Sequence, residues 1–208
     1  LTTDMDSAFR DCTSLVGTTL NDWNTATVTE MNSMFFGATS FNGNIGSWNT
    51  AIVTNMQSMF YGATSFNQNI NTSGSSWNTA AVTSMDYMFY GATAFNGNIT
   101  SWNTAAVTDM SNMFFGATTF NQNITSWNTA IVTDMSSMFN GATAFNKDIN
   151  TIGSSWNTAA VTDMSYMFSG ASAFNGNIGS WNTAAVTNMQ SMFTSATTFN
   201  QDITSWNT

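Results

Sequence analysis

Residues 29–54 read TEMNSMFFGATSFNGNIGSWNTAIVT, and close variants of this stretch follow one another through most of the chain. The tryptophan marks the period, because it recurs after either 25 or 29 residues. The eight tryptophans are Trp23, Trp48, Trp77, Trp102, Trp127, Trp156, Trp181 and Trp206. A larger period of 79 residues relates Trp48 to Trp127 and Trp77 to Trp156. Periods of this size indicate stacked repeats. We therefore expect residues 1–208 to form a single solenoid of about eight coils, with a divergent first coil over residues 1–23.

The apolar residues of one repeat predict its local structure. Their spacing of i, i+3, i+4 and i+7 is that of one helix face, and the residues are Met31, Met34, Phe35 and Ala38. Thr29 stands where an N-cap belongs and Gly37 where a helix of about two turns stops. Residues 41–48 are too short and too rich in Gly and Asn for a helix, so we expect a brief strand there. The predicted class is α/β, with a short parallel sheet on one side and short helical turns on the other.

Equivalent residues of successive coils should stack in columns, since one repeat of this length cannot bury a core alone. Phe41, Ile45 and Val53 begin three apolar columns. A column of asparagines should form a ladder of amide hydrogen bonds from coil to coil. Its members are Asn42, Asn67, Asn96, Asn121, Asn146, Asn175 and Asn200.

The composition excludes several classes of function. The 208 residues include 11 acidic and 2 basic side chains and no histidine, for a net charge of -9. Catalysis by a Ser-His-Asp or Cys-His arrangement is excluded. Arg10 and Lys147 alone cannot neutralise a phosphate backbone, which argues against a nucleic-acid partner. No apolar run is long enough to span a membrane. The chain opens at Leu1 and closes within a repeat, so we expect a piece of a longer protein.

The motif Val-Thr-x-Met-x-x-Met-Phe-x-x-Ala-x-x-Phe-Asn-x-x-Ile-x-x-Trp-Asn-Thr resembles the bacterial surface protein repeat of about 26 residues, a relative of the BspA-like leucine-rich repeats. Residues 5–15 are similar to the generic BspA-like form. The resemblance covers almost the whole chain. It implies a right-handed, leucine-rich-repeat-like solenoid and a cell-surface or secreted protein, sometimes adhesive. It carries over no catalytic residue. The units here are more regular than is usual in that family, which favours a repetitive structural role.

Two sets of residues are candidate sites. One column reads Phe36, Tyr61, Tyr90 and Phe115 before it continues as Asn140, Ser169 and Thr194. The neighbouring Phe35 is expected to face inward, so this column should face outward as a contact surface or be shielded by neighbouring corners. Three sequons make Asn71, Asn98 and Asn123 candidate N-glycosylation sites, with Asn71 expected to be the most accessible.

Two further columns leave alternatives open. Asp109, Asp134 and Asp163 stack in successive coils, where Ca²⁺ could relieve the repulsion between carboxylates or helix dipoles could stabilise each one. Thr50 begins a threonine rank that continues through Thr79, Thr104, Thr129, Thr158 and Thr183. Such a rank could order water for ice binding.

These observations predict a non-enzymatic, extracellular structural repeat protein that forms part of a filament, surface coat or adhesin stalk. Self-association into a homopolymer is the expected partnership, with glycans as a further one. The alternatives are a module that binds a protein or glycan through one solenoid face, and ice binding. No cofactor is expected unless Ca²⁺ binds the aspartate column.

Overall fold

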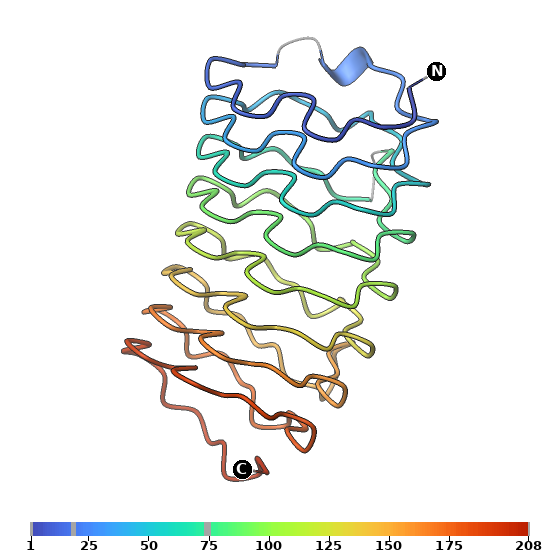
Figure 1. Cartoon of the computed structure of the whole chain (residues 1–208). Helices are drawn as coiled ribbons and strands as arrows, with labels where there is room; N and C mark the ends of the chain where they lie inside the picture. The colour runs from blue at the N-terminus through green and yellow to red at the C-terminus, as the bar shows by residue number, and fades with distance from the viewer. Residues whose placement is uncertain (1, 18–19, 73–75, 208) are drawn as a thin grey trace.

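The computed structural model describes residues 2–17, 20–72 and 76–207. The chain winds through a stack of coils that runs from the N-terminus at one end to the C-terminus at the other (Figure 1). Within the described residues, seven isolated parallel bridges connect one residue of each coil to its equivalent in the next. These residues are Asp4, Glu30, Asn55, Ser84, Asp109, Asp134, Asp163 and Asn188. We call the stretch from one of them to the next a coil, so that the first coil is 4–29 and the last begins at Asn188.

The expected α/β class is wrong. Among the described residues the one regular element is the 3₁₀ helix η1, Leu20–Asp22, and the parallel pairing consists of isolated bridges rather than strands. The coil has neither the short helices nor the parallel sheet of the leucine-rich-repeat-like architecture that we expected. Turns and irregular segments make up nearly all of the described chain.

A succession of tight turns occupies the place of the predicted helix. Ser33 and Gly37 have φ angles of 54° and 67°, and the equivalent residues of every other coil are left-handed as well. An α-helix cannot contain such residues, because its backbone is right-handed throughout. The amide of Phe36 donates to the carbonyl of Ser33, three residues back, as expected for a turn. Because left-handed residues recur four positions apart, at Ser33 and Gly37, the turns place apolar side chains on one face at a spacing like that of a helix.

The amides of this segment alternate between two kinds of partner. Those of Met31, Ser33, Phe35 and Gly37 donate to carbonyls of the following coil, at 3.2, 2.8, 2.9 and 2.7 Å. The amides of Met34 and Phe36 between them donate within their own coil, to the carbonyls of Met31 and Ser33. Since only every second amide crosses to the next coil along this edge, successive coils are held together by backbone hydrogen bonds without forming a continuous sheet.

Residues 41–48 do not form the predicted strand, and hydrogen bonds to asparagine side chains connect the coils there. The backbone amide of Asn67 donates to Oδ1 of Asn42 at 2.9 Å, and that of Asn96 donates to Oδ1 of Asn67 at 2.8 Å. The same contact continues through Asn121, Asn146, Asn175 and Asn200. The predicted asparagine ladder is confirmed. Because its acceptors are side-chain oxygens rather than backbone carbonyls, this edge of the coil is not a strand.

The core consists of side-chain files that run along the stack. Met31, Met34, Phe35 and Ala38 are fully buried, as are their equivalents in the next five coils. The rings of Phe35 and Phe41 stack at 3.9 Å within a coil, and Phe35 lies 5.6 Å from Phe60 of the next coil. Every added coil therefore buries the apolar face of the one before it, which a coil cannot do alone.

No described helix is long and apolar enough to cross a lipid bilayer.

Candidate functional site

The predicted aromatic column exists and is closely stacked. Phe36, Tyr61, Tyr90 and Phe115 are half-buried, and successive ring centroids are 4.4 Å apart with interplanar angles of 7° or less. The stacked rings cover much of one another's faces, and the column is therefore partly shielded rather than fully exposed. Its role as a contact surface stays a prediction. A sugar that binds by stacking needs an open ring face. The column therefore offers edges and hydroxyl groups to a partner rather than a stacking platform.

Two residues that sequence reasoning missed extend this column. The guanidinium of Arg10 lies 4.0 Å from the ring centre of Phe36 and covers the outer face of the first ring. Tyr87 packs beside the column, 6.5 Å from Tyr61 and 6.0 Å from Tyr90. Tyr87 is left-handed, with φ of 57°, at a position where most coils have Ser or Asn. That departure from the repeat was the available signal in the sequence.

The hydroxyl of Tyr90 responds to its burial and to the neighbouring tyrosines. Burial raises the pKa of Tyr90, and the nearby Tyr61 raises it further by charge repulsion and by a hydrogen bond to the neutral hydroxyl. Tyr87 acts in the same direction. Tyr90 therefore stays protonated at physiological pH and can donate or accept a hydrogen bond at the surface.

The three sequons differ in exposure from what we expected. Asn71 is half-buried, and its Oδ1 accepts hydrogen bonds from the amide and hydroxyl of Ser101, at 2.8 and 2.5 Å. Ser73, which completes this sequon, lies outside the described residues. Asn98 is also half-buried and caps Thr100. Asn123 is exposed, so it and not Asn71 is the most accessible of the three.

The aspartate column lies on one edge of the stack, but its carboxylates have local partners. Oδ1 of Asp109 accepts a hydrogen bond from the amide of Ser111 at 2.8 Å. Asp134 and Asp163 accept the equivalent bonds from the amides of Ser136 and Ser165. These are Asx turns, so the helix-dipole explanation does not apply. Across the residues that the structure describes, no three acidic or cysteine side chains lie close enough together to hold a metal ion.

The threonine rank proposed for ice binding is buried. Thr50, Thr79, Thr104, Thr129 and Thr158 have no exposed surface, and Thr183 is 2% exposed. The hydroxyl of Thr129 donates to the carbonyl of Asn157 and accepts its amide, both at 2.8 Å. Because the rank is internal and its hydroxyls bind the next coil, the expectation that it faces ice is wrong.

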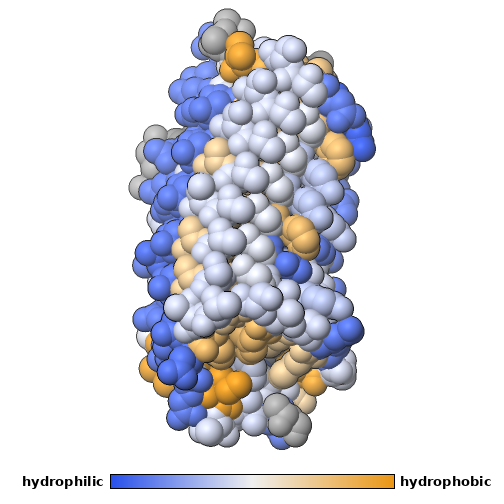
Figure 2. Space-filling model, turned by 90° about the vertical axis from the view of Figure 1, so that its left-hand side faces the viewer, coloured by the Kyte–Doolittle hydropathy of each residue, from blue (hydrophilic) through white to orange (hydrophobic). Residues whose placement is uncertain are grey.

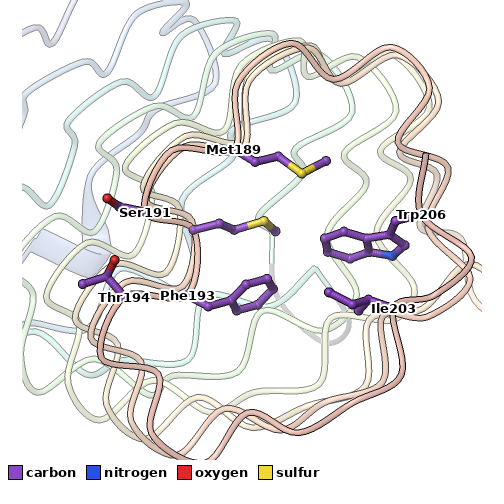
Figure 3. Close-up of a pocket in the computed structure, with 7 residues that line it drawn as sticks. Met189, Ser191, Phe193, Thr194, Ile203 and Trp206 are labelled. Carbon is purple, nitrogen blue, oxygen red and sulfur yellow. The ribbon is translucent and has the colours of Figure 1, made fainter. Parts of the chain in front are cut away.

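An apolar hollow of about 500 Å³ opens on the outer side of the last coil, and sequence reasoning missed it. Its lining includes Met189, Met192, Phe193, Ile203 and Trp206 (Figure 3). Hydrophobic side chains are visible at this lower end of the molecule, below a long pale band (Figure 2). These residues continue the files of core side chains. Their place in the last coil, rather than any motif, could have predicted the hollow from the sequence.

The comparisons with known proteins identify the family. The model described as "Mycoplasma protein of unknown function, DUF285" matches residues 3–123, 71–155 and 150–208, and so covers nearly the whole chain. No curated protein and no solved structure matches the chain. The family model therefore covers far more than half of the residues. The chain belongs to the DUF285 family.

Proposed function

We propose that this protein is a non-enzymatic structural repeat protein, which forms part of a filament, surface coat or stalk outside the cell. The observation that carries the proposal is the recurrence of one contact. The indole N–H of each tryptophan from Trp48 onward donates to a carbonyl of the preceding coil, at 2.7 to 3.3 Å. A chain that joins each coil to the next by the same contact is suited to form a long, stiff structural element.

The energetics of the core support the same proposal. Fully burying one Val, Ile, Met or Phe side chain contributes roughly 1.5–3 kcal/mol. Each internal coil buries several of them, for example Met110, Met113, Phe114, Phe120 and Ile124. In such a stack the stability is approximately a sum over coils and their interfaces. The number of coils can therefore change without loss of the architecture, as a spacer or filament subunit requires.

The extracellular location rests on the resemblance to surface repeats and on the surface chemistry. Only 6% of residues are charged, and the exposed files are largely Asn, Thr and Ser. Such a surface gains solubility from attached glycans, and Asn123 is an exposed acceptor. We include N-glycosylation at Asn123 in the proposal.

The test is to remove one large period. Deletion of residues 49–127 joins Trp48 to Asn128 across equivalent positions and removes three coils. A structural role predicts that the protein still folds and that electron microscopy of the native surface shows a thinner coat or shorter filament. A deletion of 40 residues from the same region, which breaks the register, is the control and should unfold. A fully folded 79-residue deletion that leaves the surface layer unchanged in dimensions would contradict the proposal.

The second candidate is a module that binds another protein. It is favoured by the aromatic column, which interrupts the repeat symmetry on one half of the stack. Replacing Tyr61 with Asn and Tyr90 with Ser copies residues that the same column has at Asn140 and Ser169. If the column binds a partner, this variant should fold normally and lose cell attachment or partner capture. Unchanged attachment would remove this candidate.

A further inference from the structure

Three of the four tyrosines of the chain lie together at the aromatic column. The ring centroids of Tyr61 and Tyr90 are 4.4 Å apart, and the two ring planes differ by 1°. The ring of Tyr87 lies 6.5 Å from the first and 6.0 Å from the second, and it is tilted by 33° to both. All three side chains are half-buried and reach solvent. The structure thus gathers three phenols at the surface of two adjacent coils, 55–83 and 84–108.

The neighbouring groups hold the stacked pair in place. Phe36 stacks on the other face of Tyr61, and Phe115 stacks on the other face of Tyr90, each at 4.4 Å. The amide of Gly62 donates to the carbonyl of Tyr90 at 2.7 Å and fixes the two backbones at the same point. Groups that are held together in this way react as if they were at very high concentration.

The chemistry open to two stacked phenols is oxidative coupling. A phenol that loses one electron and one proton becomes a phenoxyl radical, whose unpaired electron is shared between the oxygen and the ortho and para carbons. Two such radicals couple when a bond forms between an ortho carbon of each, and the hydrogen on each of these carbons then moves to the phenol oxygen. The ring centroids of the resulting biphenol lie about as far apart as those of Tyr61 and Tyr90. Coupling therefore requires rotation of the rings but no approach of the two coils.

Most of the other oxidisable side chains are hidden from a reagent in solution. The indoles from Trp48 onward are at most 9% exposed, and the methionines of the internal coils, such as Met110, are fully buried. A large oxidant at the surface of these coils therefore meets the half-buried phenols before it meets the core.

The chain also contains an exposed tyrosine without the stacked pair. Tyr166 follows Tyr87 by the 79-residue period and is 37% exposed. In its surroundings the aromatic column has Asn140 and Ser169 at the positions of the two stacked tyrosines. Tyr166 is therefore an internal reference for a phenol that a surface reagent can reach but that has no stacked phenol beside it.

We propose that Tyr61 and Tyr90 form a site of oxidative cross-linking, at which a haem peroxidase with hydrogen peroxide joins the two rings through a carbon–carbon bond. One molecule of peroxide accepts two electrons and two protons from the two phenols and becomes two molecules of water, so the chain loses two hydrogen atoms. The product is a covalent link between adjacent coils. An internal disulfide cannot supply such a link, because the chain has a single cysteine. This inference goes beyond the structural role proposed above and does not depend on it.

The test is oxidation of the full chain, in dilute solution, by a haem peroxidase and hydrogen peroxide. Tyr61→Phe and Tyr90→Phe each remove one phenol and keep the ring that stacks. Tyr166→Phe is the matched control, because it removes an exposed phenol outside the cluster. Circular dichroism establishes that the variants keep the fold. The blue fluorescence of the biphenol, the intact mass and the masses of proteolytic peptides then measure the reaction.

We expect the native chain and Tyr166→Phe to become fluorescent, to stay monomeric on a denaturing gel and to lose the mass of two hydrogen atoms. One cross-linked pair of peptides should contain Tyr61 and Tyr90. Tyr61→Phe and Tyr90→Phe should each lose at least ~10-fold of the fluorescence. The cross-linked native chain should unfold at a higher denaturant concentration, because the link restricts the unfolded chain as a disulfide does.

Three results would overturn the proposal. The first is a native chain that forms no intramolecular cross-link. The second is a cross-link that joins Tyr87 or Tyr166 in place of the stacked pair. The third is equal fluorescence in the native chain and in Tyr90→Phe, since the signal would then arise elsewhere.

Discussion

Trp102 and Ile70 are joined by a hydrogen bond of 2.7 Å from the indole Nε1 to the carbonyl oxygen, although they lie 32 residues apart in the sequence. The bond is buried, and equivalent bonds connect the other coils. We expect Trp102→Phe to lower the free energy of unfolding by about 1–3 kcal/mol, because the carbonyl of Ile70 loses its donor and part of the ring volume is lost. Chemical denaturation measures the change. Trp23→Phe is the control, since Trp23 is partly exposed; an equal loss in both would refute this role of the bond.

Thr129 belongs to a buried rank of threonines, whereas Thr133 belongs to an exposed rank. Thr129→Val removes a donor to the carbonyl of Asn157 and an acceptor from its amide, so the variant should lose about 1–3 kcal/mol of stability. Thr133 is exposed, and its hydroxyl makes only a long contact of 3.4 Å to Thr108. Thr133→Val should change the free energy of unfolding by less than about 0.5 kcal/mol. Similar values for the two variants, from thermal or urea unfolding, would contradict the assigned burial.

Left-handed serines offer a stabilising substitution. Ser137 has φ of 55°, a conformation that glycine adopts without the steric penalty of a side chain. Ser137→Gly should therefore raise the melting temperature, with a gain of roughly 1 kcal/mol. The neighbouring Ser136 is not left-handed, so Ser136→Gly should lower stability by about 0.5–1 kcal/mol. Differential scanning calorimetry distinguishes the two, and a loss in both variants would argue against the turn geometry.

Gly97 and Gly176 are spaced by the 79-residue period, and each lies close to the backbone of the coil before it. A Cβ at Gly97 would lie 2.1 Å from the carbonyl oxygen of Gln68, and one at Gly176 would lie 2.1 Å from that of Lys147. Gly97→Ala must push these coils apart and should cost about 1–3 kcal/mol. Gly46→Ala is the control, because its nearest neighbour is a side-chain oxygen at 3.2 Å. Equal tolerance of both substitutions in denaturant titrations would rule out the close approach.

Asp163 predicts a sensitivity to acid. Burial raises the pKa of this carboxyl, but hydrogen bonds from Ser165 and Asn188 outweigh that effect and hold the pKa below its usual range. A lowered pKa in the folded state means that the ionised form stabilises the fold above pH ~4, and that this contribution is lost as the pH falls through the folded value. The melting temperature of Asp163→Asn should therefore depend less on pH than that of the native chain as the pH falls below about 4. Parallel pH curves for the two proteins would disprove the assignment.

The periodicity of the chain determined the stacking partners of most side chains. The predicted amide ladder from Asn42 onward is present, and the columns that begin at Phe41, Ile45 and Val53 are buried over most of the stack. These features follow from identity between units, because equivalent residues of stacked repeats must meet. The column of Phe36, Tyr61, Tyr90 and Phe115 could be located in the same way.

Only the tertiary structure decided the backbone conformation and the exposure of polar files. Ser33 has a side chain that tolerates a helix, yet it is left-handed because its amide is drawn to Gln57 of the next coil. Thr50 and Thr54 are alike in the sequence, but the first is buried under Asn78 and the second is exposed. The physical reason is the same for all three residues. Their hydrogen-bond partners in neighbouring coils lie 24 to 29 positions away, and the local sequence does not show on which side of the chain a neighbouring coil will lie.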